Sequence, residues 1–60
     1  MNLQRLLKIF RRNELIIVLN EYDDVLFRGP IWWLDSKYIL SSLVVDVYRN
    51  NYLLTIVVAQ

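Results

Sequence analysis

Neither a disulfide nor a typical zinc site can hold this chain together, because it contains no cysteine and no histidine. With only 60 residues, it lies near the lower limit at which a hydrophobic core alone stabilises a fold. Apolar residues make up 57% of the chain, compared with roughly 45–50% in typical soluble domains. We therefore expect a single domain, residues 1–60, with more apolar surface than one small globule can bury.

The N-terminal segment has the pattern of a short amphipathic helix. Its apolar residues recur at the helical spacing i, i+3, i+4 and i+7: Leu3, Leu6, Leu7 and Phe10. This spacing predicts about three turns, with Asn2 as the N-cap and Asn13 as a left-handed stop. The cations of this segment are expected on its solvent side, the last two of them in the final helical turn: Arg5, Lys8, Arg11 and Arg12.

The middle of the chain predicts two strands and a short helical turn. Residues 15–19 are apolar on both faces, which is typical of a central strand. A polar turn at residues 21–24 leads to a second strand, residues 25–28, and Gly29-Pro30 is expected to end it because proline cannot donate to the ladder. Asp35 is the expected cap of a short helical turn that runs to Leu40.

The last third of the chain predicts a β-hairpin with Asn50-Asn51 as its two-residue loop, because asparagine tolerates positive φ. In this register Val47 faces Leu54, and one face of the hairpin is almost wholly aliphatic. The other face pairs Tyr48 with Leu53 and Val44 with Val57 and is mixed in character.

Together these elements predict an α+β fold in the order α-β-β-short α-β-β, with the N-terminal helix packed on a four-stranded, mainly antiparallel sheet. One short helix covers one face only, so we expect a homodimer that buries Val44, Tyr48, Leu53 and Val57. The strand from Tyr52 to Ala59 offers another route to the dimer if it lies at an edge of the sheet. A different outcome is that residues 31–40 fold across the second face and cover it internally.

The sequence offers no catalytic residue, metal site or cofactor motif. Without histidine and cysteine, catalytic triads and thiol nucleophiles are excluded. Asp23-Asp24 is better explained as turn residues than as an acid/base pair, and the segment around it lacks the pattern of a calcium loop. We therefore expect a non-enzymatic binding protein.

Two sets of residues are candidates for binding a partner. Two adjacent indoles point apart in an extended chain, so at least one of Trp32 and Trp33 should be exposed, and with Arg28 and Tyr22 they form the predicted protein-binding set. The alternative is that the segment coils and both rings cap the sheet as core. The second set, Arg5, Lys8, Arg11 and Arg12, could contact phosphates, which would make the chain a small nucleic-acid-binding regulator, although a net charge of +1 gives little long-range attraction.

The chain lacks the features of a secreted or membrane-spanning protein. The N-terminal segment has neither the continuous apolar core nor the cleavage site of a signal peptide. The longest uncharged stretch, residues 50–60, is too short to cross a bilayer. We expect a location in the cytoplasm, with no membrane partner.

Three motifs carry a resemblance to a class of proteins: the opening segment Leu3–Leu7, the acidic turn and strand Tyr22–Gly29, and the hairpin around Asn50-Asn51. In these the chain resembles small, uncharacterised proteins encoded in phages and prophages of Gram-positive bacteria. The resemblance implies an accessory factor that binds and inhibits a host protein, such as a CRISPR-Cas effector in the case of anti-CRISPR proteins. Many of those are strongly acidic, whereas this chain has a net charge of +1, so it would act through apolar and aromatic contacts.

Overall fold

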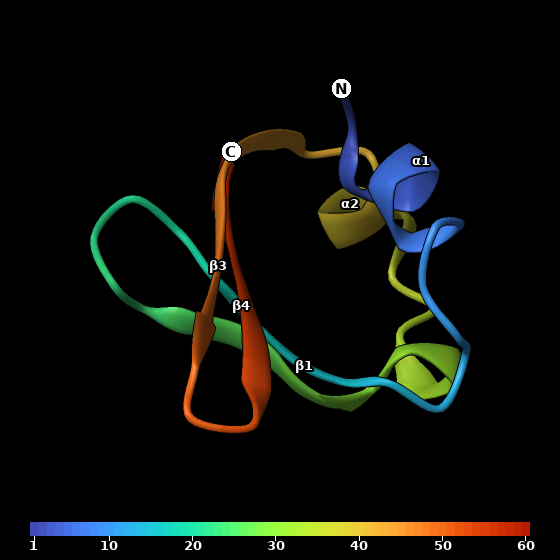
Figure 1. Ribbon diagram of the computed structural model, residues 1–60. Helices are drawn as coiled ribbons and strands as arrows, with labels where there is room; N and C mark the ends of the chain where they lie inside the picture. Colours follow the sequence, from blue (N-terminus) through green and yellow to red (C-terminus); the bar gives the residue numbers. More distant parts are fainter.

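The computed structural model describes all residues, 1–60. Its elements, shown in Figure 1, are α1 (Leu3–Leu7), β1 (Leu15–Leu19), β2 (Val25–Pro30), the 3₁₀ turn η1 (Ile31–Trp33), α2 (Lys37–Leu40), β3 (Leu43–Asn50) and β4 (Leu53–Ala59). The predicted α+β class, with a short N-terminal helix and a four-stranded, mostly antiparallel sheet, is confirmed.

Helix α1 begins as predicted but is shorter. The side chain of Asn2 accepts a hydrogen bond from the Arg5 amide at 2.9 Å and caps the helix. The helix ends at Leu7, so the prediction of three turns is wrong: Arg11 and Arg12 lie beyond it, and Asn13 is not left-handed. After Leu7 the backbone bonds change: the amides of Ile9 and Phe10 donate to the carbonyls of Leu6 and Leu7, three residues earlier, in place of the four-residue spacing of an α-helix.

The sheet has the strand order β2-β1-β4-β3, with β1 parallel to β4 and the other pairs antiparallel. The predicted central position of β1 is confirmed. Strand β4 is also internal, so it is not the uncharged edge strand that was considered as a route to a dimer. The edges of the sheet are β2 and β3.

Two boundaries in the middle of the chain differ from the prediction. Strand β2 continues through Gly29 and Pro30, which pair with Ile16 and Leu15 of β1. This is possible because proline is tolerated on an edge strand, where one side of the backbone forms no ladder bonds. Helix α2 is capped by Ser36 rather than by Asp35, since the Ser36 hydroxyl accepts a bond from the Ile39 amide at 3.4 Å.

The β3–β4 hairpin forms, but its register differs from the predicted one. Asn50 pairs with Leu53, so the loop is Asn51-Tyr52, and Val47 faces Ile56 rather than Leu54. A bulge at Val45 shifts the register again near the start of β3. Because a shift by one residue turns side chains to the other face, Val44 pairs with Val58 and packs against the core, which contradicts its predicted place in a dimer interface.

The hydrophobic core lies between one face of the sheet and the helical segments. It is formed by Leu3, Leu7, Ile16, Val18, Ile31, Leu34, Leu54, Ile56 and Val58. Ile39 and Leu40 of α2 pack against the same cluster. Residues 31–40 therefore share the helix side of the sheet with α1, and the alternative in which they cover the second face is wrong.

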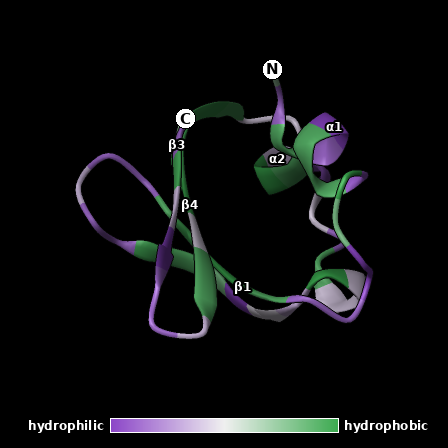
Figure 2. Ribbon diagram, in the orientation of Figure 1, coloured by the Kyte–Doolittle hydropathy of each residue, from purple (hydrophilic) through white to green (hydrophobic).

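The opposite side of the sheet, which we call the open face, has no helix on it. Strand alternation places these residues there: Leu15, Ile17, Leu19, Arg28, Asp46, Tyr48, Leu53, Thr55 and Val57. In Figure 2 strand β4 is coloured mainly as hydrophobic, whereas the β1–β2 turn and part of β3 are coloured as hydrophilic. Both faces of the central strands are thus apolar, and the fold covers only one.

Candidate functional site

Two segments that lie far apart in the sequence are held side by side at the helical end of the molecule. The amide of Ile31 donates to the carbonyl of Glu14, and the amide of Trp32 donates to the carbonyl of Arg12, each at 3.0 Å. These bonds attach the basic segment that follows α1 to the tryptophan-containing turn η1. In the sequence these two segments are separate candidate binding sites.

The tryptophan pair is exposed. Trp32 and Trp33 are 54% and 58% exposed, and their rings meet edge to face with centroids 5.6 Å apart. The prediction that at least one indole is exposed is confirmed, and the alternative that both rings are core is wrong. Both rings reach the surface because η1 coils around Ile31, whose side chain takes the buried position.

The ring of Trp33 packs against Gly29 of β2. A Cβ atom at Gly29 would lie 3.0 Å from Cε3 of Trp33, and the glycine has a φ of 150°, which other residues rarely adopt. The Trp33 ring therefore packs directly on the backbone of β2, while its outer part stays accessible. This contact fixes the position of the pair without burying it.

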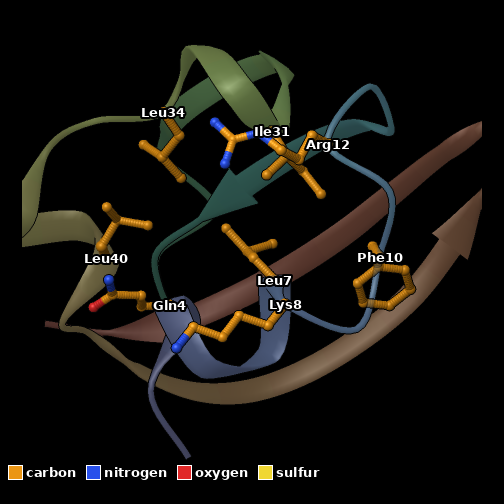
Figure 3. Close-up of a pocket in the computed structure, with 8 residues that line it drawn as sticks. All are labelled: Gln4, Leu7, Lys8, Phe10, Arg12, Ile31, Leu34 and Leu40. Carbon is orange, nitrogen blue, oxygen red and sulfur yellow. The ribbon is translucent and has the colours of Figure 1, made fainter.

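The residues on either side of the pair in the sequence, Ile31 and Leu34, line a hollow of about 380 Å³, which we call the α1–η1 groove (Figure 3). Its lining residues are Gln4, Leu7, Lys8, Phe10, Arg12, Ile31, Leu34 and Leu40. In Figure 3 the Arg12 guanidinium lies near Ile31 on one side of the hollow, and Lys8 extends toward Gln4 on the other. The groove thus combines a floor of leucine and isoleucine side chains with two cations at its rim.

The four predicted phosphate contacts, Arg5, Lys8, Arg11 and Arg12, are all exposed, and none has an ion-pair partner within the protein. The only ion pair of the chain joins Arg49 to Glu14 at 3.3 Å. Among the four predicted phosphate contacts, Lys8 and Arg12 line the groove, whereas Arg5 and Arg11 do not. The two groove cations are therefore available to an anionic group of a ligand.

The other members of the predicted protein-binding set lie elsewhere. Tyr22 is 86% exposed in the β1–β2 turn, at the opposite end of β2 from the tryptophan pair. Arg28 pairs with Ile17 and belongs to the open face. Strand β2 separates these residues, so the four do not form one surface.

Three of the four predicted dimer residues lie together. Tyr48, Leu53 and Val57 belong to the open face, and Val44 belongs to the core side. A second hollow of about 380 Å³ is found on the open face and is lined in part by Tyr48, Leu53 and Arg28. Arg28 therefore lies with the predicted dimer residues and not with the tryptophan pair.

The acidic turn has the structural role that its composition indicated. The Asn20 side-chain oxygen accepts bonds from the amides of Tyr22 and Asp24 at 2.8 and 3.0 Å, and Asp23 adopts a φ of 66°. Asp23 and Asp24 are therefore turn residues. Nowhere does the structure gather three or more His, Cys, Asp or Glu side chains that could hold a metal ion.

Most of the groove lining was not predicted from the sequence. Gln4, Leu34 and Leu40 were not singled out, because they become neighbours only when α1, η1 and α2 pack together. The only local signal was the spacing i, i+3 of Ile31 and Leu34, which places both side chains on one side of a helical turn.

The groove lining contains amide, ammonium and guanidinium groups but no carboxylate, hydroxyl or thiol. None of the helices has the length and apolar character needed to cross a membrane. No protein-family model, curated protein or solved structure matches the chain.

Proposed function

We propose that the protein is a non-enzymatic interaction protein that binds an acidic, apolar segment of another protein in the α1–η1 groove. The observation that carries this proposal is the location of two unpaired cations, Lys8 and Arg12, at the rim of an apolar hollow that is lined by Ile31 of η1, the turn that also carries two half-exposed tryptophans. Each part of this arrangement suits a different feature of a protein ligand.

The floor of the groove suits an apolar side chain. Leu7, Ile31 and Leu34 are held in the core and present a preformed surface. The hollow of about 380 Å³ is large enough for one or two large side chains. Burying such a side chain would contribute about 1.5–3 kcal/mol to binding.

The rim of the groove suits a carboxylate next to that side chain. Arg12 can bind a carboxylate through two parallel N–H donors, and Lys8 adds a second positive charge across the hollow. Trp32 and Trp33 add flat aromatic area of the type that is enriched in interaction hot spots. The preferred ligand is therefore a segment with a large apolar residue flanked by aspartate or glutamate.

The identity of the partner is suggested by the resemblance to small phage and prophage proteins. It supports a role in the cytoplasm of a bacterial host, where the protein would bind and inhibit a host protein such as a CRISPR-Cas effector. Inhibition would follow if the acidic segment belongs to a surface that the host protein needs for its own contacts.

The groove also has features of a site for single-stranded nucleic acid, because cations lie next to aromatic rings that can stack on bases. The aliphatic floor and the net charge of +1 favour the protein ligand. The dependence on salt separates the two classes. Phosphate contacts weaken by orders of magnitude as the salt concentration rises, whereas a largely apolar contact changes little.

Selection from a library of random peptides tests the proposal. The selected peptides should share a large apolar residue next to aspartate or glutamate, and binding should change the fluorescence of the tryptophan pair. Arg12→Glu should weaken binding by about tenfold or more. Arg11→Glu is the matched control, because Arg11 is an exposed arginine next in the chain that does not line the groove.

The proposal is wrong if no peptide is enriched, or if Arg11→Glu and Arg12→Glu weaken binding equally. Preferential binding of a fluorescent oligonucleotide that is lost with rising salt would replace it with the nucleic-acid alternative.

A further inference from the structure

The open face is an apolar surface that the fold leaves without cover. Its centre consists of Ile17, Leu19, Leu53 and Val57 from the two internal strands. Its margins are more accessible, since Leu15 is 52% exposed and Tyr48 is 43% exposed. All helical segments pack on the other side, so no helix covers this face, although Thr55 in its central row is only 3% exposed.

The charges on this face are self-complementary. Strand alternation places Arg28 on it at one edge of the sheet, in β2, and Asp46 at the other edge, in β3. Neither residue has an ion-pair partner in its own chain. When a second copy of such a surface is rotated by 180° and faces the first, the cation of each copy lies opposite the anion of the other.

We propose that a second copy of the chain covers the open face, related by a two-fold axis that runs along the strands between β1 and β4. This rotation sets β2 of one copy opposite β3 of the other, because it reverses the order of the strands across the interface. The apolar centres of the two sheets then face each other, as in a β-sandwich.

The register places the charged groups within reach of each other. Arg28, Ile17, Thr55 and Tyr48 lie in one row across the sheet. Asp46 lies two residues from Tyr48, which is about 7 Å along β3. The long Arg28 side chain can therefore contact the Tyr48 ring of the second copy and the Asp46 carboxylate beside it.

The area of the open face determines how tightly two copies are expected to bind each other. The molecule measures 24 × 24 × 17 Å. Its broad face can bury on the order of 500 Å² per copy, or about 1,000 Å² in total, which is near the lower limit for a specific interface. The dimer should therefore exchange with monomer at micromolar concentrations. It leaves the groove of each copy free, so this inference does not depend on the proposed function.

Sedimentation equilibrium between about 5 and 500 µM tests the dimer, since this range brackets a weak specific complex. The wild-type mass should rise toward twice the monomer mass of 7.3 kDa. Arg28→Glu and Asp46→Arg should each raise the dissociation constant by about tenfold, and the combined variant should restore it to within about threefold. Lys37→Glu on α2 is the control for a change of net charge and should have no effect.

Circular dichroism verifies that each variant is folded. A wild-type protein that stays monomeric over the whole range would overturn the proposal and leave this face to a different partner. A dimer that responds equally to the single changes and to the combined change would also overturn it, because the charges would then not face each other.

Discussion

Trp32 and Trp33 are both more than half exposed, although tryptophan gains more from burial than most residues. Each ring nevertheless has a packing contact. The Trp33 ring rests on Gly29, and the Trp32 ring meets the Trp33 ring edge to face. A rigid, exposed aromatic group loses little conformational entropy when it binds a partner, which favours a role in recognition.

Replacing Trp32 with alanine should have a small effect on folding. We expect the free energy of unfolding to fall by less than about 1.5 kcal/mol, compared with about 3–5 kcal/mol for a fully buried tryptophan. Urea denaturation followed by circular dichroism measures this difference. Ile56→Ala serves as the comparison, because Ile56 is fully buried. It should cost about 2–5 kcal/mol. Equal losses in the two variants would show that Trp32 belongs to the core.

At the scale of single elements, the sequence predicted the existence of each strand better than its register. The apolar character of both faces of residues 15–19 predicted a central strand, and β1 is central, although the fold covers only one of its two faces. The hairpin loop was placed one residue too early, since Asn50 and Asn51 both tolerate a turn. The local sequence therefore does not determine which of the two asparagines begins the loop.

The bulge at Val45 depends on contacts that are distant in the sequence. The amide of Val44 donates to the Met1 carbonyl, and the amide of Leu3 donates to the Ser42 carbonyl, each at 2.9 Å. These bonds align the start of β3 with the N-terminal segment, and the bulge accommodates the difference from the hairpin register. The groove also depends on distant contacts, since α1, η1 and α2 all line it, and it was therefore not predictable from local patterns.

The loop of the hairpin gives a direct test of the observed register. Asn51 has a φ of 59°, whereas Asn50 belongs to β3 and lies opposite Leu53. Asn51→Val should therefore lower the free energy of unfolding by about 1–2 kcal/mol, because a β-branched residue is strained at positive φ.

Asn51→Gly should be neutral or slightly stabilising for the same reason. Asn50→Val is the matched control and should be tolerated, since valine suits a strand. Thermal or urea denaturation of the three variants distinguishes the registers. If Asn50→Val were the more damaging change, the loop would lie at Asn50-Asn51 instead.

At the scale of the whole molecule, the fold separates two surfaces. The α1–η1 groove and the tryptophan pair lie at the helical end, while the open face lies on the other side of the sheet. A dimer through the open face would present two grooves at once. A partner with two acidic segments would then bind more tightly than either contact alone allows, because the second contact becomes intramolecular.

The central claim is that a protein ligand binds in the α1–η1 groove, and backbone amide NMR with a selected acidic, apolar peptide tests it most directly. We predict that the largest shifts occur in residues 7–12 and 31–34 and at the two tryptophan indole N–H signals, with little change at Ile17 and Val57 on the open face. Shifts centred on the open face, or unchanged indole signals at saturating peptide, would contradict the account.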